Sequence, residues 1–161
     1  MPLYVKFISP AWYESLDLPA IVLGLIISCA STSTASIEKD EKAKSFETIS
    51  NKGVVYLYRP GRALGAAGQT QVKINGLDAG GTGPGTFFRW ELTPAEYVFS
   101  CKTPESSAAV ELNVESGKLY FLMQNEHLGV SSGRVSLKEV NEKEGMKAVN
   151  NSKLLISTYT N

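Results

Sequence analysis

Residues 110–123 read VELNVESGKLYFLM and carry the two patterns that decide the fold. From Val110 to Val114, apolar and polar residues alternate, which is the two-residue period of a strand with one face in a core and one in water. Leu119–Met123 is apolar at every position, which is typical of a central strand that is covered on both faces. Ser116-Gly117 lies between the two patterns and predicts a hairpin turn.

The same patterns recur toward the N-terminus. Residues 54–58 are apolar at every position, and residues 72–74 and 87–92 alternate like strands. Asn75-Gly76 suits a turn that needs positive φ. Residues 79–85 read AGGTGPG and are expected to form a loop. Short strands at this spacing predict an all-β fold, a small antiparallel β-sandwich in preference to a barrel.

A short helix is expected after the last strand. Asn141 and Glu144 have the spacing of an N-terminal helix cap, and the pattern continues to Asn150. Gly145 in its interior weakens the helix. We expect this helix to fold onto one end of the sheets.

An apolar run precedes the domain. Residues 18–30 read LPAIVLGLIISCA, which matches the length of a signal-peptide core and falls short of the roughly twenty residues of a membrane-spanning helix. The run ends in Ile26-Ile27-Ser28-Cys29, which resembles the lipobox of bacterial lipoproteins. That resemblance implies cleavage between Ser28 and Cys29, with diacylglycerol on the Cys29 sulfur and acylation of the new amino terminus.

Such lipidation would fix the protein to a membrane, because each buried methylene contributes about 0.8 kcal/mol. Ala30 stands where an aspartate would prevent sorting in Gram-negative envelopes, so the resemblance implies the periplasmic face of the outer membrane. Residues 1–17 make a poor n-region, with Lys6 as the single cation and Glu14 and Asp17 close to the apolar run. Two alternatives stay open: a start downstream of Met1, or an uncleaved N-terminus that anchors the protein differently or leaves it cytoplasmic.

Three segments are therefore expected along the chain. Residues 1–28 form the signal peptide, residues 29–52 form a lipid-anchored flexible linker, and residues 53–161 form the sandwich with its C-terminal helix. The linker begins with small polar residues and continues with mixed charges, and a flexible chain of this length reaches about 25 Å. A short helix across Glu38–Phe46 is the alternative.

Charge and cysteine content exclude several classes of protein. Sixteen basic residues balance sixteen acidic ones, so nucleic acid is not an expected partner. Once Cys29 is lipidated, Cys101 has no partner for a disulfide, and its place in a strand pattern predicts a small buried hydrophobic side chain.

Four motifs carry a family resemblance: Gly53–Pro60 (GVVYLYRP), Val72–Gly76 (VKING), Leu92–Tyr97 (LTPAEY) and Gly117–Phe121 (GKLYF). Together they resemble a bacterial family of unknown function that is common among small envelope lipoproteins. They are also similar to PEGA-type modules, although Ala95 stands where those modules usually have glycine. The resemblance brings no catalytic residues.

Candidate chemistry is sparse. His127 is the single histidine, and with Glu126, Ser131 and Ser132 it would imitate a hydrolytic set. A polar turn is the favoured interpretation, because no nucleophile elbow is present. Zinc and calcium spacings are missing, and Gly81–Gly85 lacks the lysine and the following helix of a phosphate loop. We therefore expect no catalytic, cofactor-binding or metal-binding residues.

The favoured function is a non-catalytic binding or structural module tethered through Cys29. Its contact surface would be the loops Gly61–Gly68 and Ala79–Gly85, or an exposed sheet edge, and its partner an envelope protein or glycan. The aromatic residues Tyr56, Tyr58 and Trp90 are either a face for sugar or peptide, or core, and core is favoured. The alternative is an envelope hydrolase that uses His127.

Overall fold

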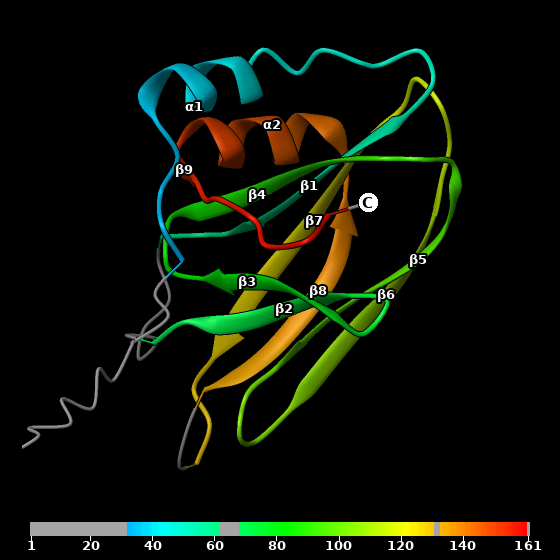
Figure 1. Ribbon diagram of the computed structural model, residues 1–161. Helices are drawn as coiled ribbons and strands as arrows, with labels where there is room; N and C mark the ends of the chain where they lie inside the picture. Colours follow the sequence, from blue (N-terminus) through cyan, green and yellow to red (C-terminus); the bar gives the residue numbers. More distant parts are fainter. Residues whose placement is uncertain (1–31, 62–67, 131–132, 161) are drawn as a thin grey trace, which may run out of the picture.

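The computed structural model describes residues 32–61, 68–130 and 133–160, and it places two stacked β-sheets under a layer of two helices (Figure 1). The elements in chain order are α1 Ile37–Ala43, β1 Gly53–Arg59, β2 Thr70–Ile74, β3 Leu77–Thr82, β4 Thr86–Leu92, β5 Ala95–Lys102, β6 Ser107–Val114, β7 Leu119–His127, β8 Arg134–Val140, α2 Glu142–Asn150 and β9 Lys153–Leu154. The predicted β-sandwich with a short C-terminal helix is confirmed.

The first sheet has the order β8-β7-β1-β4-β9 and the second sheet has the order β3-β2-β5-β6. Strand β1 lies at the centre of the first sheet, antiparallel to β4 and parallel to β7. Both segments that are apolar on both faces are therefore central strands, as predicted. The other strand pairs among the described residues are antiparallel, whereas β1 pairs with β7 and β4 pairs with β9 in parallel.

Each face of β1 belongs to a different core. Val55 and Leu57 point into the space between the two sheets, while Val54, Tyr56 and Tyr58 join the cluster beneath the helices. All seven residues of β1 are buried. The continuous apolar pattern is explained by this double cover, because a strand with helices on one face and a second sheet on the other has no polar side.

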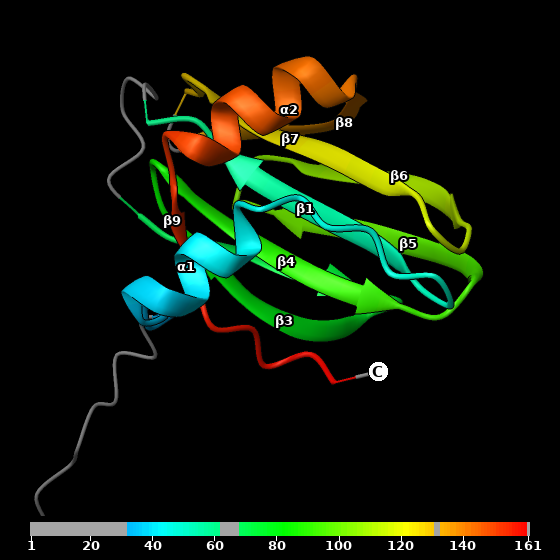
Figure 2. The same ribbon diagram turned by 90° about the horizontal axis from the view of Figure 1, so that it is seen from above.

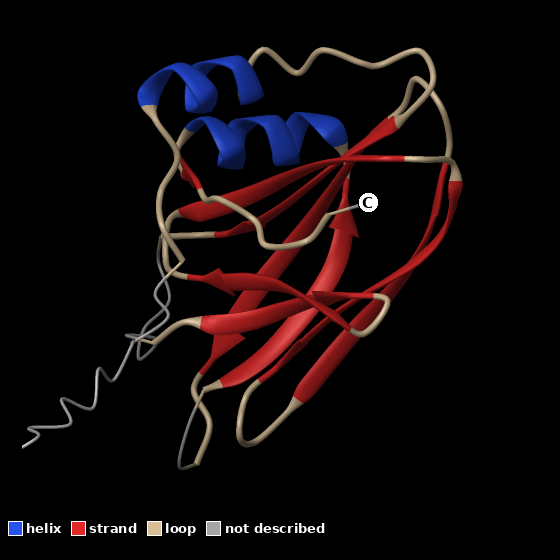
Figure 3. Ribbon diagram, in the orientation of Figure 1, coloured by secondary structure: helices blue, strands red, loops and turns tan. Residues whose placement is uncertain are grey.

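Both helices cover the outer face of the first sheet, as Figures 2 and 3 show from two directions. The Asn141 side chain accepts a hydrogen bond from the Glu144 amide at 3.0 Å, which confirms the predicted cap. The expected position at one end of the sheets is wrong, since α2 lies across β7 and β1. Gly145 permits this approach, because a Cβ there would lie 2.2 Å from Cγ of Phe121.

One predicted turn is confirmed and another is corrected. Asn75 and Gly76 have φ values of 50° and 81° and join β2 to β3 as a hairpin. Ser116-Gly117 is a turn, but not the turn of a hairpin. Strand β6 pairs with β5 in the second sheet, whereas β7 pairs with β1 and β8 in the first. The turn therefore carries the chain from one sheet to the other.

The glycine-rich segment 79–85 is only partly a loop. Strand β3 continues through Gly80 and Gly81 to Thr82, and the pairing of β2 with β3 shifts register between Val72 and Lys73. Glycines are tolerated here because β3 is an edge strand with a bulge, where the usual cost of glycine in a strand is offset by close backbone approach. The prediction that this segment contains no regular element is wrong.

The described part of the expected linker is packed on the domain. Thr34 forms an antiparallel bridge with Leu155, and the Asp40 carboxylate accepts a hydrogen bond from the Leu154 amide at 2.7 Å. Tyr56 donates its hydroxyl hydrogen to the Ala43 carbonyl at 2.7 Å. A domain boundary at Gly53 is therefore too late, and the helix alternative is closer to the structure than a flexible chain.

Residues 1–28 and the cleavage site Ser28-Cys29 lie outside the described residues. Among the residues that the structure does describe, neither helix has the length and apolar character needed to cross a membrane.

Candidate functional site

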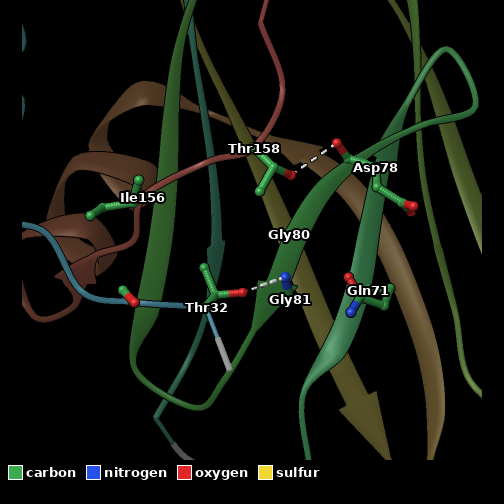
Figure 4. Close-up of a pocket in the computed structure, with 8 residues that line it drawn as sticks. Thr32, Gln71, Asp78, Gly80, Gly81, Ile156 and Thr158 are labelled. Atoms are coloured by element: carbon green, nitrogen blue, oxygen red, sulfur yellow. Dashed lines mark hydrogen bonds between the residues drawn. The ribbon is translucent and has the colours of Figure 1, made fainter. Parts of the chain in front are cut away.

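A groove of about 500 Å³ opens where the two ends of the described chain meet the β2–β3 hairpin (Figure 4). Its lining comes from the N-terminal segment, the C-terminal segment and the two strands: Thr32, Ser33, Gln71, Asp78, Gly80, Gly81, Ile156 and Thr158. It therefore overlaps one of the two segments named above as expected contact loops, the glycine-rich segment 79–85.

The N-terminal wall is held by backbone pairing with the C-terminal segment. The Ala35 amide donates to the Leu154 carbonyl at 2.8 Å, and the Ile156 amide donates to the Ser33 carbonyl at 2.9 Å. The Thr32 hydroxyl accepts a hydrogen bond from the Gly81 amide at 2.7 Å. These bonds fix the chain from Thr32 onward against the edge strand β3.

The C-terminal wall crosses the opening between β4 and β3. The Ser157 hydroxyl accepts from the Trp90 indole of β4 at 2.8 Å and donates to the Ala79 carbonyl of β3 at 2.8 Å. Thr158 donates its amide to the same carbonyl and its hydroxyl to the Asp78 carbonyl at 3.1 Å. The edge of the second sheet at β3 is thus covered in part by the first and last described segments.

The floor of the groove is bare backbone. Gly80 has a φ of 115°, and a Cβ on it would lie 2.9 Å from the Phe88 ring, so a side chain is strongly disfavoured there. Around this floor stand the Gln71 amide, the Asp78 carboxylate and the Ile156 side chain, which is 51% exposed. The arrangement offers hydrogen-bond donors and acceptors beside a small apolar surface.

A buried ion pair lies at one end of the sandwich. Arg59 is fully buried at the end of β1 and contacts the Glu126 carboxylate of β7 at 2.8 Å. Its guanidinium also donates to the Gly68 carbonyl at 2.9 Å and to the Thr82 carbonyl at 3.0 Å. Thr70 donates its hydroxyl hydrogen to the second oxygen of Glu126. This Arg59 cluster ties four strand ends together.

Burial lowers the pKa of Arg59, and the charge of Glu126 opposes that effect. A buried charge of this kind is costly to desolvate and depends on its counter-ion and hydrogen bonds. This cluster was not predicted from the sequence. An arginine, Arg59, at the end of an otherwise apolar strand pattern is the feature that could have indicated it. The arrangement serves to hold the ends of β1, β2, β3 and β7 in register.

The residues of the hydrolase alternative are not assembled as a catalytic set. His127 is exposed and its Nε2 lies 3.1 Å from the Ser136 hydroxyl of β8. The neighbouring Glu126 is directed into the interior, toward Arg59. Ser131 and Ser132 lie outside the described residues, as does most of the loop after Gly61. In the described residues, no three histidine, cysteine or acidic side chains gather in a way that would hold a metal ion.

The aromatic candidates and the second cysteine belong to the core. Tyr56, Tyr58 and Trp90 are at most 5% exposed, so the interpretation of these rings as a sugar-binding face is wrong. Cys101 is buried between the sheets, as predicted. Burial raises the pKa of the Cys101 thiol to about 12, with a smaller contribution from the charge of Glu126.

A protein-family model described as "Protein of unknown function (DUF2846)" matches residues 49–136. This match covers more than half of the chain and runs from the turn before β1 into β8. The chain belongs to the DUF2846 family. All four motifs on which the sequence resemblance was based lie inside the matched range, so assignment to a family of unknown function is confirmed.

The similarity extends beyond the DUF2846 match. An uncharacterized protein of Haemophilus influenzae is 30% identical over 159 residues, which cover 96% of this chain and 94% of that protein. An alignment of this extent takes in α1 and α2 as well as the strands. The aligned range therefore includes the helices that cover the first sheet.

Proposed function

We propose that this DUF2846 protein is an envelope lipoprotein, cleaved before Cys29 and held by lipid at the periplasmic face of the outer membrane, with a non-catalytic binding or structural domain. The observation that carries the proposal is the sequence Ile26-Ile27-Ser28-Cys29 at the end of an apolar run of signal-peptide length. A cysteine in that position is an acceptor for diacylglycerol.

The position of the domain supports the proposal. The described fold begins at Thr32, and both of its apolar cores are built from residues at or beyond Ala43. Cleavage before Cys29 would leave these cores intact.

Fatty-acid labelling tests the anchor. The protein with Cys29→Ser should lose incorporation of an alkyne-bearing palmitate in cells and should keep its signal peptide. The matched control is Cys101→Ala, which removes the other cysteine and should label like the wild type. Undiminished labelling of the Cys29→Ser protein would refute the lipoprotein.

The groove supports a binding role for the domain. Its bare glycine floor, the Gln71 amide and the Asp78 carboxylate favour a polar, extended ligand such as a glycan or a peptide segment of another envelope protein.

Site-directed photo-crosslinking tests the groove. A photoreactive residue in place of Gln71 should give a discrete adduct in intact cells, whereas the same residue in place of Glu111, exposed on β6, should not. Equal crosslinking from both positions, or none from either, would contradict a ligand in the groove.

A further inference from the structure

The domain is attached to the proposed lipid anchor by a very short piece of chain. Two residues, Ala30 and Ser31, separate Cys29 from Thr32. The Thr32 hydroxyl is already bound to the Gly81 amide of β3. An extended chain spans at most about 3.6 Å per residue, so the three steps of chain from position 29 to position 32 can reach at most about 11 Å. An acyl chain on Cys29 would therefore hold this part of the domain at the membrane.

Contacts identify which end of the sandwich this is. Gly81 is followed by Thr82, whose carbonyl accepts a hydrogen bond from Arg59, and Arg59 contacts Glu126 near the end of β7. The Gly85 amide donates to the Arg59 carbonyl at 3.0 Å. We call this the anchor end. It lies on the left in both Figure 1 and Figure 2, with the turn between β3 and β4 and the start of α1.

The anchor end carries the most exposed apolar side chains of the described residues. Val130 is 91% exposed, Ile37 is 77% exposed and Leu128 is 72% exposed. Leu128 and Val130 directly follow the end of β7, and Ile37 is the first residue of α1, beside the paired chain ends. Single exposed apolar residues are ordinary on protein surfaces. Here, however, three of them lie at the end that would carry the proposed tether.

The tip after β7 is held in place. The Val130 amide donates a hydrogen bond to the Glu105 carboxylate at 3.0 Å, and the same carboxylate lies 3.5 Å from the Arg134 guanidinium. The stretch that carries Leu128 and Val130 is thus tied to Glu105 between β5 and β6. A positioned apolar tip needs no rearrangement to enter the boundary between lipid head groups and acyl chains.

We propose that the anchor end rests on the lipid bilayer, with Leu128, Val130 and Ile37 in contact with the membrane beside the acylated Cys29. This inference rests on the proposed lipidation and adds an orientation to it. The tether raises the effective concentration of these side chains at the lipid surface. Contacts that would be too weak to hold an untethered protein on the membrane can therefore form. The groove over β3 then opens close to the membrane.

Environment-sensitive fluorescence tests the orientation. The lipidated protein, with a single cysteine introduced by Leu128→Cys or Ile37→Cys, is labelled with the fluorophore NBD and reconstituted in phosphatidylethanolamine–phosphatidylglycerol vesicles. Cys101 stays unlabelled because it is buried. The matched control is Leu77→Cys, an exposed leucine at the other end of β3, about 16 Å along the strand from Thr82.

Labels at positions 128 and 37 should show a blue-shifted emission and should be quenched by nitroxide lipids, whereas the label at position 77 should show neither. If the lipidated protein shows no emission shift at positions 128 and 37, or equal shifts at all three positions, the proposed orientation is wrong. Either result would leave the proposed lipid anchor standing. A shift that requires added envelope protein also overturns it. Failure of the Cys29 thiol to take up fatty acid removes both the anchor and the orientation.

Discussion

Replacing Gly145 by alanine probes the contact between α2 and the first sheet. A Cβ at this position would lie 2.2 Å from Cγ and 2.4 Å from Cβ of Phe121. Carbon atoms in contact are normally about 3.5–4.0 Å apart, so either α2 moves outward by more than 1 Å or Phe121 leaves its stack on Tyr56. Overpacking of this kind costs about 1–3 kcal/mol, while alanine regains up to about 1 kcal/mol of helix propensity.

We expect Gly145→Ala to lower the free energy of unfolding by about 1–2 kcal/mol, because the overlap involves the Cβ of Phe121, which cannot rotate away. Urea denaturation followed by circular dichroism and tryptophan fluorescence measures the change. Lys143→Ala, at an exposed site of the same helix, is the control and should change the stability by less than about 0.5 kcal/mol. Combining Gly145→Ala with Phe121→Leu should recover part of the loss. A Gly145→Ala protein as stable as the wild type would refute the close packing of α2.

Three further predictions concern buried groups. Glu126→Gln removes the counter-ion of the buried Arg59 and should lower the free energy of unfolding by about 3–5 kcal/mol in urea titrations, and a loss below about 1 kcal/mol would contradict the Arg59 cluster. Burial raises the pKa of Tyr58 to about 12, and an unfolded tyrosine has a pKa of about 10, so this contribution to stability is complete below pH 10 and is lost as the pH rises toward 12. Tyr58→Phe should flatten that alkaline loss in thermal melts, and an unchanged slope would argue against it. In the Cys29→Ser protein, Cys101 should react with Ellman's reagent only after denaturation, because the thiol is buried and burial raises its pKa; rapid reaction of that native protein would show that the site is open.

The strands could be predicted from the sequence because burial on one or both faces is recorded in the apolar pattern. Leu119–Met123 and residues 54–58 are apolar throughout since helices cover one face of the sheet and a second sheet covers the other. The cap at Asn141 was predictable because it depends only on residues three positions apart in the sequence. The partner of each strand was not, because Ser116-Gly117 has the composition of a hairpin turn and yet leads to a different sheet.

The candidate site was predicted only in outline. The glycines at 80 and 81 were recognised as unusual, but their position in an edge strand depends on Phe88 and on Thr32, about fifty residues away. The polar walls come from the two ends of the chain, and residues 32–36 consist of small side chains whose composition resembles a linker. Pairing of these residues with the C-terminal segment depends on tertiary contacts that leave no periodic signal.

The central pairing of β1 with β7 sets the order in which the molecule can be completed. Val54 lies beside Leu119, and the ribosome adds the residues between them over roughly 3–13 seconds at ordinary elongation rates. During that interval the middle strand of the first sheet lacks one neighbour, and closing so long a loop slows folding further. Since one apolar core includes Leu155 and the other includes Val149, neither core can be completed until nearly the whole polypeptide has been made.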